Sequence, residues 1–133
     1  MRETQVTAKL VKILCSIQGC YAKKHHGGMF SSGEPDIQAC YRGHAIRIEV
    51  KMDTGELSKL QTQQLECWRI AGALTILAVY LPHTKMFDVH TCRRGKTWPE
   101  FAGSVKQLKP SIQTVDCCVA SWEVALACEL SRQ

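Results

Sequence analysis

Apolar and polar positions follow two different periods in the first fifty residues. From Glu3 to Ile17 the apolar residues recur at helical spacing, with Lys9 and Lys12 on the other side. Between residues 44 and 52 the period changes to two, and apolar residues alternate with charged ones: Ile46, Ile48 and Val50 against Arg47, Glu49 and Lys51. The pattern predicts a helix over 3–17, a short strand leading into a Gly/Ser loop, and strands over 37–42 and 44–52 around a turn at Arg42-Gly43.

The next segment predicts a helix followed by a fully buried strand. Ser58 is a credible N-cap for a helix that ends at Gly72, marked by Leu60, Leu65, Trp68 and Ile70. The run "ALTILAVYL", residues 73–81, is apolar throughout, as expected of a central strand covered on both faces. A strand, a crossover helix and another buried strand predict a right-handed parallel unit.

Beyond Pro82 the periodicity is weaker. It indicates an edge strand over 85–90, a short helix over 98–108 and a final helix with an apolar stripe made of Val115, Val119, Trp122, Leu126 and Leu130. The stripe has two interpretations: it builds a dimer interface, or it covers the open face of the sheet within one chain.

Length and composition indicate a single domain over 1–133. The chain has 133 residues, no linker-like segment and no apolar run near the roughly 18 residues that span a bilayer. The N-terminus lacks the features of a secretory signal, so we expect a cytoplasmic protein with no membrane partner. A net charge of +5 suits an anionic partner such as nucleic acid without establishing one. The eight cysteines form no CxxC pair, which favours buried free thiols over disulfides or a zinc site.

The charged side of the strand over 44–52 carries candidate chemistry. Glu49 and Lys51 are two residues apart, so they point the same way, and Asp36 enters from the neighbouring strand. Carboxylate oxygens are ligands that Mg²⁺ prefers, and a lysine beside them is placed to hold or deprotonate an attacking water. The alternative is a solvated strand face with a simple ion pair.

Together, "GEPDI", "IRIEVK" and "TGELSKLQ" resemble the PD-(D/E)XK nuclease superfamily and, within it, the VRR-NUC (virus-type replication-repair nuclease) domain. The match covers residues 3–80, leaving 84–133 as a C-terminal extension. The resemblance implies an α/β, restriction-endonuclease-like core with a mixed central β-sheet flanked by helices. It also implies residue roles: metal binding by Asp36, Glu49 and the main-chain carbonyl of Val50, catalysis by Lys51, support of the lysine or of a phosphate by Gln61, and Glu3 at the rim of the metal site.

The same resemblance implies a metal-dependent endodeoxyribonuclease that uses Mg²⁺, with Mn²⁺ able to substitute. Proteins similar to this one are typically encoded by phages or bacteria, and act as homodimers on branched DNA such as Holliday junctions. A small domain has little surface for base readout, which also favours recognition of DNA shape. The alternatives are a sequence-specific or nicking nuclease of the same fold, and a non-catalytic DNA-binding subunit.

Several assignments have a structural alternative. Glu3 also suits the first turn of a helix through the helix dipole, and Gln63 and Gln64 compete with Gln61 for its role. Lys23 and Lys24 are candidates for binding the DNA backbone, or members of a solvated charge cluster. The tryptophans Trp68 and Trp122 are expected as core or interface anchors rather than base-stacking platforms.

Overall fold

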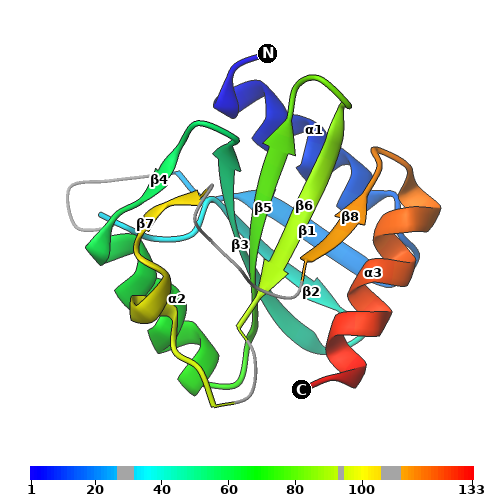
Figure 1. Ribbon diagram of the computed structural model, residues 1–133. Helices are drawn as coiled ribbons and strands as arrows, with labels where there is room; N and C mark the ends of the chain where they lie inside the picture. The colour runs from blue at the N-terminus through cyan, green and yellow to red at the C-terminus, as the bar shows by residue number, and fades with distance from the viewer. Residues whose placement is uncertain (27–31, 93–94, 106–111) are drawn as a thin grey trace.

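The computed structural model describes residues 1–26, 32–92, 95–105 and 112–133 and has an α/β architecture (Figure 1). Its elements follow in the order α1 (Glu3–Cys15), β1 (Cys20–Lys24), β2 (Ile37–Tyr41), β3 (His44–Met52), β4 (Glu56–Leu57), α2 (Lys59–Ile70), β5 (Leu74–Leu81), β6 (Met86–Thr91), the 3₁₀-helix η1 (Trp98–Phe101), β7 (Gly103–Ser104), β8 (Ile112–Val115) and α3 (Val119–Ser131).

A mixed sheet in the order β1-β2-β3-β5-β6-β8 forms the centre of the fold. Strands β3 and β5 run parallel, whereas the other neighbouring pairs run antiparallel. Helices α1 and α3 pack on one face, and α2 with η1 packs on the other (Figure 1). The predicted fold class, a mixed central sheet flanked by helices, is therefore confirmed, as is the parallel pairing of the strands before and after α2.

A two-residue turn determines which side chains of β3 face each helical layer. Arg42 and Gly43 both have positive φ, 47° and 86°, as a type I′ hairpin requires, and the turn pairs Tyr41 with His44. With this register, the alternating apolar residues of β3 pack into the core beneath α1. The charged residues of the same strand consequently point to the face that carries α2.

The apolar stripe of the final helix belongs to the core of the chain. Trp122 is fully buried, its ring meets that of Phe87 edge to face at 5.3 Å between centroids, and Leu126 is buried beside it. Val115 lies in β8 rather than in the helix. The stripe therefore covers the sheet within one chain, and its interpretation as a dimer interface is wrong for Trp122 and Leu126.

Three other predictions need correction. The strand near 85–90 is not at the edge, because β8 pairs with its free side. In place of a helix over 98–108, η1 ends at Phe101 and β7 follows, while residues 106–111 lie outside the described part. Leu60 and Ile70 are 42% and 72% exposed, so they are not part of the buried face of α2.

The cysteines are free but not buried, contrary to expectation. Four are exposed and four are half-buried, so none belongs to the fully buried core. No helix of the described residues combines the length and the apolar character needed to cross a membrane.

Candidate active site

Glu49 is a buried carboxyl group in the middle of the sheet. Its side chain is 2% exposed, its Oε1 accepts a hydrogen bond from Gln61 Nε2 at 3.3 Å, and its Oε2 has no partner among the described residues. Burial raises the pKa of Glu49 far above its ordinary value of 4.5, and the negative charge of Asp36 raises the pKa further. An ionised carboxylate at this position is costly unless a cation offsets its charge.

Asp36 is held beside Glu49 by the main chain. Its Oδ2 accepts a hydrogen bond from the Val50 N–H at 2.9 Å, and its carbonyl accepts one from His25 N–H at 2.8 Å. The loop before it turns at Gly33, where φ is +79° and an added Cβ would lie 2.6 Å from Leu60 Cγ. Exposed Leu60 thus supports the loop that delivers Asp36, rather than filling the core.

The first turn of α2 orients Gln61 toward Glu49. The Ser58 hydroxyl accepts a hydrogen bond from Gln61 N–H at 3.1 Å, and Gln61 Oε1 accepts one from Ser58 N–H at 2.9 Å, which is a capping box. Because the amide oxygen is used by the cap, the amide nitrogen faces Glu49. The structure therefore brings Gln61 to the carboxylate and leaves Gln63 exposed on the helix surface.

Lys51 and Glu3 lie at the border of the same site. Lys51 is half-buried on the side of β3 that carries Glu49, and an added Cβ at Gly55 would lie 3.3 Å from Lys51 Cδ. Glu3, at the start of α1, is close enough to Lys51 and Asp36 for their charges to affect its pKa. Burial raises the pKa of Glu3, the Lys51 ammonium opposes that shift, and the Asp36 carboxylate adds to it. Glu3 therefore lies near Lys51 and Asp36 and also occupies the first turn of a helix, and its place at the rim of a metal site stays a prediction.

The donor atoms at this site fit a hard divalent cation. Asp36 and Glu49 offer carboxylate oxygens, and the unpartnered Oε2 of buried Glu49 is the group that most needs a positive charge. Across the described ranges, no three His, Cys, Asp or Glu side chains form a ligand set of their own. Such an ion would therefore need further oxygen ligands, which is the role predicted for the Val50 carbonyl together with water and a phosphate.

The two candidate DNA-binding lysines lie on opposite sides of β1. Lys23 is opposite Gln38 and Lys24 is opposite Ile37, a fully buried core residue. Alternation along the strand therefore directs Lys23 to the face that bears Glu49 and Lys24 to the other face. Both lysines are exposed, and most of the Gly/Ser loop beyond them, residues 27–31, lies outside the described part.

Arg47, which was not among the predicted site residues, lies on the same side of β3 as Glu49. Its guanidinium stacks on the Trp68 ring at 4.1 Å from the centroid, and Trp68 Nε1 donates a hydrogen bond to Glu34 Oε2 at 3.1 Å. Trp68 is thus half-buried beneath a cation instead of being a core anchor. The spacing of two between Arg47 and Glu49 was the sequence signal for their shared face.

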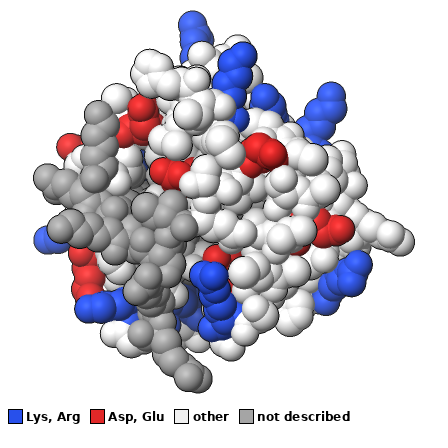
Figure 2. Space-filling model, turned by 45° about the vertical axis from the view of Figure 1, so that its right-hand side comes forward, with Lys and Arg blue, Asp and Glu red and all other residues white. Residues whose placement is uncertain are grey.

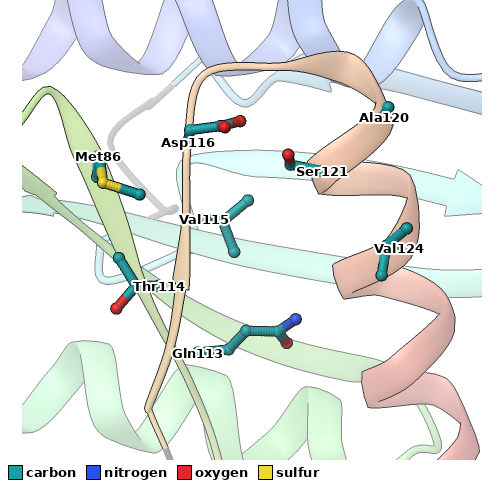
Figure 3. A pocket seen from close by; sticks show the side chains of 8 residues that line it. All are labelled: Met86, Gln113, Thr114, Val115, Asp116, Ala120, Ser121 and Val124. Carbon is teal, nitrogen blue, oxygen red and sulfur yellow. The ribbon is translucent and has the colours of Figure 1, made fainter.

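A separate hollow is lined by residues from the last third of the chain and by Met86, none of which belongs to the site around Asp36 and Glu49. It measures about 380 Å³, lies between β8 and α3, and has Asp116 as the charged residue in its lining (Figure 3). Figure 2, which brings this side forward, shows acidic and basic side chains scattered among uncharged ones. In that view basic side chains lie mainly along the upper edge and in the lower part, with acidic side chains between them.

The chain is similar to a solved structure but matches no protein-family model and no curated protein. Among solved structures, a similar chain is Hjc from Archaeoglobus fulgidus, a Holliday junction resolvase from an archaeal hyperthermophile. The identity is 27%, the match covers 71% of this chain and 81% of that chain, and the TM-score is 0.49. The resemblance to VRR-NUC domains accordingly stays a prediction from the motifs.

Burial of Glu49 predicts that Glu49→Gln stabilises the metal-free protein. The glutamine amide keeps the hydrogen-bonding shape without a charge to desolvate. The folded state favours the protonated form of Glu49, because its folded-state pKa is raised above the unfolded value of 4.5. The free energy of unfolding is therefore highest below pH 4.5 and falls as the pH rises from there toward the folded-state pKa. The advantage of the variant should therefore grow with pH, by up to about 1.4 kcal/mol per pH unit within that window.

Thermal unfolding in EDTA at pH 5 and pH 8 measures this effect for both proteins. The matched control is Glu56→Gln, which removes an exposed carboxylate next to the same helix. A Glu49→Gln variant that is less stable than wild type at pH 8 would contradict the assignment of Glu49 as a destabilising buried acid.

Proposed function

We propose that the protein is a metal-dependent endodeoxyribonuclease that hydrolyses phosphodiester bonds in branched DNA such as Holliday junctions. The observation that carries the proposal is the convergence of Asp36, Lys51 and the buried, partly unpartnered carboxyl of Glu49. An arrangement that only stabilised the fold would not place two carboxyl groups side by side with one of them at 2% exposure. The motif resemblance supplies the choice of reaction and of branched DNA.

The residues of the site have distinct roles in this proposal. Asp36, Glu49 and the Val50 carbonyl would hold Mg²⁺, or Mn²⁺ in its place, and Glu3 would contact the ion's outer ligands. A bound divalent ion supplies neutralisation of phosphate charge and a lower pKa for a coordinated water. Lys51 would hold the attacking water and, in its neutral amine form, accept the proton that the water loses, while Gln61 would fix the orientation of Glu49 through the hydrogen bond described above.

A two-fold dimer is part of the proposal because resolving a four-way junction takes two symmetric cuts. Two copies related by a two-fold axis hold two active sites in a fixed relation. Trp122 and Leu126 are buried within one chain and are therefore excluded as the contact surface. Light scattering of the purified protein tests the dimer, and a mass near the 14.9 kDa of one chain at micromolar concentration would contradict it.

The test of function is cleavage of a panel of DNA substrates. Linear duplex, flap, fork and four-way junction DNA of matched sequence are incubated with the protein in Mg²⁺, Mn²⁺ or EDTA. We expect cleavage of the junction in either metal and none in EDTA. Cleavage of plain duplex at one sequence would favour the restriction-type alternative, and binding of DNA without cleavage in any metal would favour the non-catalytic alternative.

A further inference from the structure

A row of polar side chains crosses the open side of β1, β2 and β3, next to the carboxylates. Lys23 is opposite Gln38, and Gln38 is opposite Arg47. Arg47 precedes Glu49 by two residues on the same strand, so the row lies on the face of the sheet that bears Glu49. It is separated from Glu49 by two residues along the strand direction. Two residues along a strand span about 7 Å, comparable to the separation of neighbouring phosphates on a nucleic acid strand.

Arg47 is held in a fixed orientation with donor capacity left over. Its planar guanidinium stacks on the Trp68 ring, and its Nη1 donates hydrogen bonds to the carbonyls of Ile46 at 2.9 Å and Ala39 at 3.4 Å. Its Nε–H is buried out of reach of a ligand, whereas its Nη2 makes no hydrogen bond to the described residues and is the donor left for one. No carboxylate of the described residues lies within 4.0 Å of it as an ion-pair partner. A fixed guanidinium with a free donor is suited to a phosphate oxygen.

The side chains of the row line a shallow hollow of about 200 Å³. Its lining consists of Tyr21, Lys23, Gln38, Ala39, Cys40 and Arg47. The two charged residues in that lining are both positive, and the nearby Glu34 carboxylate, which is bound to Trp68 Nε1, offsets part of the Arg47 charge without lining the hollow. Tyr21 is 69% exposed at its border and presents an aromatic ring on which a sugar or base can pack.

Gln38 is positioned by a contact of its own. Its amide Nε2 lies 3.0 Å from His25 Nδ1, and the backbone of His25 is in turn tied to Asp36. His25 therefore connects Gln38, in the lining of the hollow, with the main chain of Asp36. This connection keeps the hollow at a constant distance from the carboxylates.

We propose that this hollow binds the phosphodiester next to the one that is cleaved, with Arg47 and Lys23 as its ligands. The inference rests on the proposed function, because it takes the cleaved phosphate to lie at Asp36 and Glu49. It assigns a role to Lys23 and not to Lys24, whose side chain leaves the opposite face of β1. The ligand is one phosphate group within a DNA strand, bound without regard to base identity.

The experiment measures binding of a fluorescent four-way junction over a range of salt concentrations in EDTA, so that no cleavage occurs. Lys23→Ala and Arg47→Gln should each weaken binding about 5- to 10-fold and reduce the slope of log affinity against log salt by about one. Because both residues contact the same phosphate, the double variant should lose less than the product of the single losses. Lys12→Ala, an exposed lysine of α1, is the control with the same change in charge and should match wild type.

Trp68 gives a second, local measurement. The other two tryptophans, Trp98 and Trp122, are fully buried, so DNA entering the hollow should change the emission of Trp68 in particular, and Trp68→Phe should abolish the change. If Arg47→Gln unfolds the protein, exposed Lys23 still tests the inference. Wild-type affinity and salt slope in Lys23→Ala would overturn the phosphate subsite while leaving the nuclease intact; absence of DNA binding by wild type would overturn both.

Discussion

Lys51→Ala is expected to abolish DNA cleavage while leaving a folded protein that still binds metal. The ammonium group lies beside the proposed metal ligands and makes no ion pair within 4.0 Å among the described residues, so its removal takes away little native structure. General acid-base groups typically contribute 10²- to 10⁴-fold to a rate, so we expect a loss of about 10³-fold or more. Single-turnover cleavage in Mg²⁺ gives the rate, and circular dichroism checks the fold.

Asp36→Ala should have an equal effect through loss of a proposed metal ligand, and Glu3→Ala a milder one because Glu3 is proposed to contact only the ion's outer ligands. Lys59→Ala is the matched control, since Lys59 is an exposed lysine at the start of α2, near the site in sequence but outside it. Wild-type cleavage by Lys51→Ala or Asp36→Ala would refute the assignment of the active site.

The largest effect on stability is expected for Trp122→Glu, which should not fold. Trp122 is 0% exposed between α3 and the sheet and meets Phe87, which in turn meets Tyr80 at 5.3 Å. Removing a large buried aromatic side chain typically costs about 3–5 kcal/mol, and a buried charge without a partner adds to that. Because domains of this size are stable by only about 5–15 kcal/mol, the combined cost is enough to unfold this one.

Two further variants separate core packing from other causes. Val124→Glu places the same charge on the same helix at a position that is 65% exposed, and should fold normally. Trp122→Phe keeps an aromatic ring against Phe87 and removes an indole N–H that has no partner among the described residues, so it should be much milder than Trp122→Glu. A folded, monomeric Trp122→Glu protein would show that Trp122 belongs to an interface instead.

The first eighty residues were predictable because their signals are local. Alternation of apolar and charged residues in β3 shows which side chains share a face, and Arg42-Gly43 marks the turn that aligns β3 with β2. Together they were enough to place Asp36, Glu49 and Lys51 in one site. Ser58 was predicted as an N-cap from its residue type, and the capping box then brought Gln61 to Glu49.

The misplaced features depend on contacts between distant segments. Strand β8 is four residues long and exists through its pairing with β6, so its sequence alone has no clear strand pattern. Leu60 looked like a core residue because helical periodicity does not report that Gly33 packs against it. The role of Arg47 depends on Trp68, twenty-one positions later, and on a hollow formed by three strands.

The type I′ turn at Arg42-Gly43 also constrains how chain length can vary in relatives and engineered forms of this protein. An insertion of one residue there would reverse the faces of β3 in its pairing with β2, sending Glu49 and Lys51 toward α1 and the isoleucines toward water. A deletion of one residue would do the same. Loop length elsewhere is thermodynamically inexpensive to change, since closing a longer loop costs little. An odd number of added or removed residues in this turn would separate Glu49 and Lys51 from Asp36, whereas an even number would leave them on one face. This hairpin is therefore a poor place for a tag or a fused domain.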